Sequence, residues 1–74
     1  MESARLVNMA NQIGKFFESQ GEEAVAIAGI ADHLKKFWDP RMRRELAEYL
    51  ERGGDGVAPL VAAAVRALTQ NAST

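Results

Sequence analysis

The sequence predicts an all-α fold, a small single domain in which about four short helices form a bundle. Apolar residues recur at spacings of three and four along most of the chain, which is the period of an amphipathic helix. The dipeptide Asp39-Pro40 and the glycine-rich stretch 53–56 interrupt this pattern, and no useful length alternates with the period of a strand. The 74 residues include no cysteine, so a small core must hold the domain without a disulfide.

Two apolar stripes predict the first two helices. Over residues 3–19 the stripe comprises Leu6, Met9, Ala10, Ile13, Phe16 and Phe17. Over residues 22–38 it comprises Ala24, Ile27, Ile30, Ala31, Leu34 and Trp38. Gly14 and Gly29 lie inside these helices, where each costs about 1 kcal/mol relative to alanine. We therefore expect another element to approach closely at both glycines.

The dipeptide Asp39-Pro40 predicts a corner between the second helix and a third helix over residues 40–51. Proline disfavours helical geometry at the residue before it, so the second helix should end by Trp38. Asp39 is a favourable N-cap, and Pro40 is a favourable first residue of a helix. A single dipeptide thus ends one helix and begins the next.

A fourth helix is predicted over residues 58–69, after the glycine-rich loop 53–56. Pro59 is suited to its first turn, and the apolar residues that follow are in helical phase. We expect the four helices to form one domain over residues 1–70, with a flexible tail over residues 71–74.

The segment 35–44 holds five of the nine basic residues and the only tryptophan of the chain. With the only histidine just upstream, it supplies the candidate partner interface: His33, Phe37, Trp38, Arg41, Arg43 and Arg44. Trp38 could plug the helix junction or stack on Arg43. The arginines could pair with Glu45 and Glu48 on a solvated face, or they could meet carboxylates or phosphates of a partner. Composition alone favours neither role of the arginines.

The patterns required for chemistry at a metal, nucleotide or nucleophile are missing. His33 has no second histidine or cysteine to share a metal, no serine lies in a Gly-x-Ser-x-Gly turn, and the loop 53–56 lacks the Lys-Ser/Thr of a P-loop. We predict no catalytic, metal or cofactor site in this chain. A net charge of −1 and the lack of a signal-peptide or transmembrane pattern indicate a cytoplasmic protein without a membrane partner.

Four segments of the chain resemble a known family. They are Met9-Ala-Asn-Gln-Ile-Gly-Lys-Phe-Phe17, Ile30-Ala-Asp-His-Leu34, Phe37-Trp-Asp-Pro-Arg-Met-Arg43 and Pro59-Leu-Val61, and in this order they are similar to the delta subunit of cytoplasmic NAD-dependent formate dehydrogenase. The resemblance implies a small bacterial subunit without a redox centre. It also implies a complex whose other subunits carry a molybdenum or tungsten pterin, iron–sulfur clusters, FMN and NAD. Ala58 departs from the family, where serine is frequent, so we expect a weak start of the fourth helix.

The leading hypothesis is an accessory subunit that supports assembly, stability or cofactor loading by docking on the catalytic subunit through the candidate interface. The alternative is a nucleic-acid-binding helical module in which Arg41, Arg43 and Arg44 of the third helix reach phosphates. A third hypothesis is a helical homo-oligomer. A chain with a thin core is also expected to pair with itself when isolated from its partner.

Overall fold

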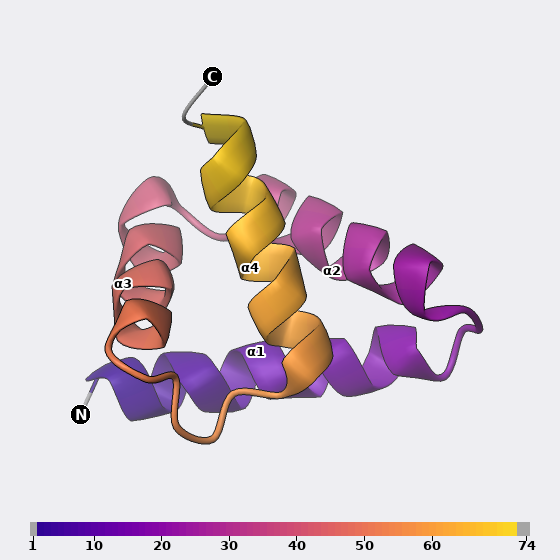
Figure 1. Cartoon of the computed structure of the whole chain (residues 1–74), viewed down its shortest axis with the longest axis horizontal. Helices are drawn as coiled ribbons and strands as arrows, with labels where there is room; N and C mark the ends of the chain where they lie inside the picture. Colours follow the sequence, from indigo (N-terminus) through magenta and orange to yellow (C-terminus); the bar gives the residue numbers. More distant parts are fainter. Residues whose placement is uncertain (1, 73–74) are drawn as a thin grey trace.

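The structure, a computed structural model, describes residues 2–72. Within this range four α-helices follow one another without a strand: α1 (Glu2–Glu18), α2 (Glu23–Phe37), α3 (Pro40–Glu51) and α4 (Pro59–Ala72). The α1–α2 hairpin forms a V, α3 stands at its open end, and α4 lies across both arms (Figure 1). The prediction of an all-α fold with four short helices is confirmed.

The helix boundaries differ most from the predicted ones at the end of α4. This helix continues through Asn71 and Ala72, which were expected in the tail, whereas Ser73 and Thr74 lie outside the described residues. The buried stripe of α2 is centred on Ala26, Ile30 and Leu34, so the predicted stripe was placed slightly off the core.

The Asp39-Pro40 corner forms as the sequence predicts. Trp38 leaves helical geometry with φ −94° and ψ 139°, and Pro40 is the first residue of α3. The Asp39 carboxylate accepts a hydrogen bond of 2.9 Å from the N–H of Met42, one of the amide donors that a helix start leaves without an internal partner. The corner turns α3 so that Trp38 enters the core, where the residue is 6% exposed.

The core receives large side chains from every helix and lies where α4 crosses the hairpin. The largest fully buried side chains are Leu6, Ile30, Leu34, Leu46 and Val61. No polar or charged residue is buried within the described part of the chain. Burial of each large apolar side chain contributes roughly 1.5 to 3 kcal/mol, so these few contacts supply much of the driving force for folding.

Gly14 and Gly29 lie at two close approaches, as their cost inside helices predicts. A Cβ atom on Gly14 would lie 2.7 Å from Cγ2 of Val61, well inside ordinary carbon contact distance. A Cβ atom on Gly29 would lie 2.5 Å from Cδ1 of Phe17. Gly14 therefore admits α4 against α1, and Gly29 admits an aromatic ring of α1 against α2.

Two side chains hold the loop between α3 and α4. Asn11 of α1 donates from Nδ2 to the carbonyl of Gly56 at 2.9 Å, and its Oδ1 accepts from the N–H of Ala58 at 3.0 Å. The hydroxyl of Tyr49 donates to the carbonyl of Asp55 at 2.6 Å. The start of α4 thus has an acceptor from another helix, which compensates for the missing side-chain cap at Ala58.

Gly14→Ala should lower the free energy of unfolding by about 1 kcal/mol or more, although alanine alone favours a helix by a similar amount. Val61 is fully buried, and valine in a helix strongly prefers one rotamer, so Cγ2 has little room to move away. Urea denaturation followed by circular dichroism measures the change. In a Val61→Ala background the same substitution should cost less, and a stabilising effect in the unmodified chain would contradict the close contact.

Asn11→Leu should lower the free energy of unfolding by about 1 to 2 kcal/mol, because it leaves the N–H of Ala58 and the carbonyl of Gly56 without their partner. Asn11→Asp keeps an acceptor for Ala58 and places a negative charge near the start of α4, so it should cost less. Chemical denaturation of both variants tests this order. Equal losses would show that the bond to Ala58 does not stabilise the chain.

Candidate functional site

Four aromatic rings form a continuous row on one face of the α1–α2 hairpin, called here the aromatic row: Phe16, Phe17, His33 and Phe37. Their successive ring centroids are 5.1, 6.2 and 4.7 Å apart. Phe16 is 61% exposed and Phe37 is 72% exposed. Aromatic surface of this extent open to water is typical of a site that contacts another molecule.

The aromatic row follows one ridge of α2. Gly29, His33 and Phe37 are four residues apart and therefore lie one above the other. Because Gly29 has no side chain, Phe17 packs there and continues the row onto α1. Phe16 and Phe17 are about 100° apart around the helix, and in the structure Phe17 packs against the core whereas Phe16 is exposed. The predicted place of Phe16 in the apolar stripe was therefore wrong.

An open hollow of about 450 Å³ lies beside the aromatic row. Its lining residues are Met9, Gln12, Ile13, Phe16, Phe17, His33 and Trp38. All but Gln12 present apolar or aromatic surface, which suits an apolar side chain of a partner protein.

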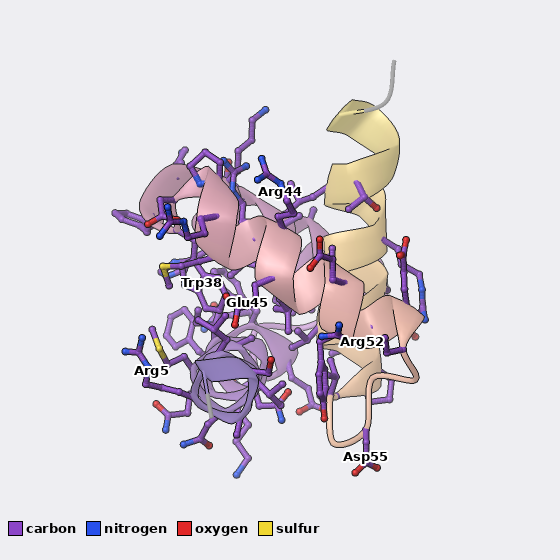
Figure 2. The ribbon with its side chains drawn as sticks, turned by 90° about the vertical axis from the view of Figure 1, so that its left-hand side faces the viewer. Arg5, Trp38, Arg44, Glu45, Arg52 and Asp55 are labelled. Carbon is purple, nitrogen blue, oxygen red and sulfur yellow. The ribbon has the colours of Figure 1, made fainter. Side chains whose placement is uncertain are left out.

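Trp38 plugs the junction of the helices, which is one of the two roles that the sequence left open. Figure 2 shows Trp38 below α3 on the side of α1, while Arg44 lies at the upper edge of α3. The stack of Trp38 on Arg43 is not among the ring contacts of the described residues, and the two side chains line different hollows. A partner can therefore contact only the small exposed part of the Trp38 side chain, which lines the hollow.

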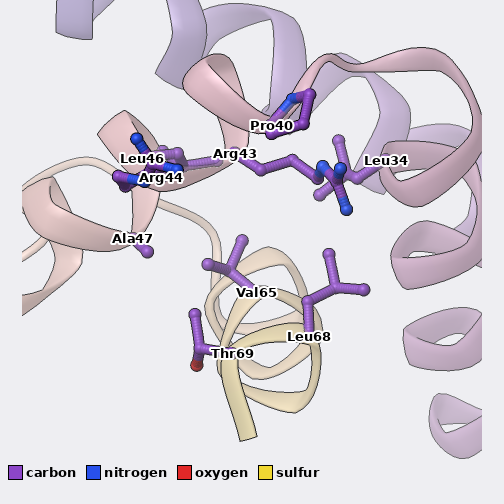
Figure 3. Close-up of a pocket in the computed structure, with 9 residues that line it drawn as sticks. All are labelled: Leu34, Pro40, Arg43, Arg44, Leu46, Ala47, Val65, Leu68 and Thr69. Atoms are coloured by element: carbon purple, nitrogen blue, oxygen red, sulfur yellow. The ribbon is translucent and has the colours of Figure 1, made fainter. Parts of the chain in front are cut away.

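The three candidate arginines of α3 lie in different surroundings. Arg41 and Arg44 are exposed, whereas Arg43 is half-buried and stretches across a second hollow, between α3, α2 and α4 (Figure 3). Among the described residues no ion pair joins the arginines of α3 to Glu45 or Glu48, which was one of the two roles that the sequence left open. The Nε atom of Arg43 is buried and has no hydrogen-bond partner among the side chains and backbone that the structure describes. These cations are thus not neutralised by the acids of their own helix.

The structure groups only part of the predicted interface. His33 and Phe37 are in ring contact, and Trp38 lines the hollow next to them. Arg43 and Arg44 belong to the other hollow. The predicted interface is therefore divided into an aromatic part and a basic part.

Comparison with known families decides where this chain belongs. The family model described as NADH-dependent formate dehydrogenase delta subunit FdsD matches residues 5–65. The chain belongs to this delta-subunit family. No curated protein and no solved structure matches the chain. The matched residues include the whole aromatic row and the three arginines of α3, so the candidate site lies within the part of the chain that defines the family.

The described side chains do not gather into a cluster of metal ligands. No group of three or more histidine, aspartate or glutamate side chains that could hold a metal ion is found in residues 2–72, and the sequence has no cysteine. His33 lies between the rings of Phe17 and Phe37. Within the same range no helix has the length and apolar character needed to cross a membrane.

Arg43→Met should raise the free energy of unfolding by about 1 kcal/mol and the melting temperature by roughly 4 to 8 °C, because it removes an unpaired, partly buried guanidinium while keeping the apolar stem. Thermal denaturation measures the shift. Arg41→Met, at an exposed position of the same helix, is the matched control and should change stability by about 0.5 kcal/mol at most. Destabilisation by Arg43→Met alone would mean that its guanidinium has a stabilising partner.

Proposed function

We propose that this chain is a non-catalytic accessory subunit of an NAD-dependent formate dehydrogenase, which docks on the catalytic subunit and supports assembly, stability or cofactor loading of the complex. Membership in the delta-subunit family supports the place in the complex. The observation that carries the docking role is the aromatic row, with Phe16 and Phe37 exposed on a small protein.

The docking face comprises the candidate interface together with the two phenylalanines of α1: Phe16, Phe17, His33, Phe37, Trp38, Arg41, Arg43 and Arg44. Its aromatic part would supply most of the affinity, because full burial of each large ring contributes roughly 1.5 to 3 kcal/mol. The exposed arginines would orient the encounter and raise its rate, since rim charges affect association more than final affinity.

Docking alone is sufficient for a supporting role. A ligand that binds only the folded form of a protein stabilises it by about 2.7 kcal/mol when present at 100 times its dissociation constant. A bound accessory subunit could therefore keep the catalytic subunit folded until it is loaded. The molybdenum or tungsten pterin, iron–sulfur clusters, FMN and NAD would reside in the other subunits, in the cytoplasm.

Replacing both exposed rings, Phe16→Ser with Phe37→Ser, should reduce co-purification with the catalytic subunit by about tenfold or more, because the central apolar contact is lost. Formate-dependent reduction of NAD in the same extracts should fall with it. Val25→Ser is the matched control, because Val25 is 57% exposed on α2 and takes no part in the ring contacts.

Circular dichroism of the isolated variants should show unchanged helix content, since neither ring is buried. Undiminished co-purification of the folded double variant would refute the aromatic row as the docking face. The family assignment does not depend on that result.

A further inference from the structure

The flank of α2 opposite the aromatic row carries a second surface of different chemistry. The buried stripe of α2 separates the two flanks, with the ridge of His33 and Phe37 on one side. On the other side lie Ala24, Ala28 and Ala31, of which the first two are exposed. Small side chains in such a position permit a helix to approach closely.

Two hollows meet along this flank and share Arg43 and Leu68. The first has a volume of about 430 Å³ and is lined by Leu34, Pro40, Arg43, Arg44, Leu46, Ala47, Val65, Leu68 and Thr69. The second has a volume of about 560 Å³ and is lined by Ala24, Ile27, Ala28, Ala31, Asp32, Lys35, Arg43, Ala67 and Leu68. In Figure 3 the Arg43 side chain extends from α3 toward Leu34 and Leu68. Arg43 thus stands between two parts of one surface, which we call the α2–α4 groove.

The α2–α4 groove is lined mostly by apolar side chains and carries more cations than acids. Arg43, Arg44 and Lys35 are its cations. Its one acid, Asp32, already forms an ion pair of 3.2 Å with Lys36. Within the described part of the chain the buried Nε of Arg43 has no acceptor. A buried donor without an acceptor is costly, and a carboxylate is the acceptor that a guanidinium binds most strongly.

We propose that the α2–α4 groove binds an amphipathic helix of a partner protein that carries carboxylates beside its apolar stripe. Leucine-sized side chains at helical spacing would fill the two hollows, as in other complexes where a helix lies in a groove. The alanines of α2 would lie under the helix, and Arg43 would donate to a carboxylate between the hollows. The groove shares Arg43 and Arg44 with the docking face proposed above. It lies apart from the aromatic row, and its binding of a helix does not require that the aromatic row docks on the catalytic subunit.

The test uses the full chain, labelled with ¹⁵N, and two synthetic helical probes of roughly 16 residues. Both probes carry leucine at positions i, i+3, i+4 and i+7, and they differ only in having glutamate or lysine at the flanking positions. The glutamate probe should shift the amides of Ala28, Ala31 and Leu68 in a saturable manner. It should bind at least about tenfold more tightly than the lysine probe.

Substitutions test whether the preference for the glutamate probe over the lysine probe arises in the α2–α4 groove. Arg43→Gln should remove most of the discrimination between the probes, whereas Arg41→Gln on the same helix should preserve it. Ala28→Glu, at an exposed position, should lower the affinity for the glutamate probe, both in the unmodified chain and in the Arg43→Gln variant. Phe37→Ser should leave the affinity for the probe unchanged. The helix-binding proposal and the proposed docking through the aromatic row can therefore fail independently.

Five outcomes would overturn the proposal, four of which concern the probes. These four are equal affinity of the two probes, absence of saturable shifts, shifts confined to the aromatic row, and full discrimination retained by Arg43→Gln. Amide shifts of the groove that depend on dilution of the chain alone would also overturn it, because a second copy of the chain would then be the occupant.

Discussion

The close crossing of α4 over α1 at Gly14 is the contact on which the arrangement of the other helices depends. Cγ2 of Val61 lies in the space that a side chain at position 14 would fill. Asn11, one turn earlier on α1, fixes the first turn of α4 through its bond to Ala58. With its start held at two points, α4 extends across the hairpin, and Val65 reaches both the core and the α2–α4 groove.

The fold was predictable from the sequence where its cause is local. The stop of α2, the cap of α3 and the first residue of α3 all lie within residues 38–42, so their chemistry can be recognised without knowledge of the tertiary structure. The start of α4 was not predictable in the same way. Its acceptor, Asn11, is 47 residues from Ala58, and no local pattern records that contact.

The candidate site was predictable to a smaller extent. His33 and Phe37 are four residues apart on one helix, so their proximity follows from helical geometry alone. The stack of Trp38 on Arg43 was compatible with the spacing, but burial of the large ring in the core placed Trp38 on the other side of α3. The sequence could not decide whether the arginines of α3 pair with Glu45 and Glu48, because an exposed pair contributes only about 0.3 to 0.5 kcal/mol. Among the described residues these pairs are absent, whereas the exposed pair of Asp32 and Lys36 forms.

Arg43 indicates how the isolated chain differs from the chain in an assembly. The buried Nε atom of Arg43 has no acceptor among the described residues, which lowers the stability of this small domain. The same atom becomes favourable when a partner supplies a carboxylate, so its cost in the isolated chain is consistent with selection for contact.

The two flanks of α2 place geometric limits on an assembly that uses both. Helices pack with their axes about 8 to 10 Å apart, so a segment on the aromatic row and a helix in the α2–α4 groove would lie within roughly 20 Å of each other. The buried stripe of Ala26, Ile30 and Leu34 fixes α2 between them. Such a chain would join two partner segments as a rigid spacer. Such a role depends on the shape and the surface chemistry of the chain, and it requires no reactive group.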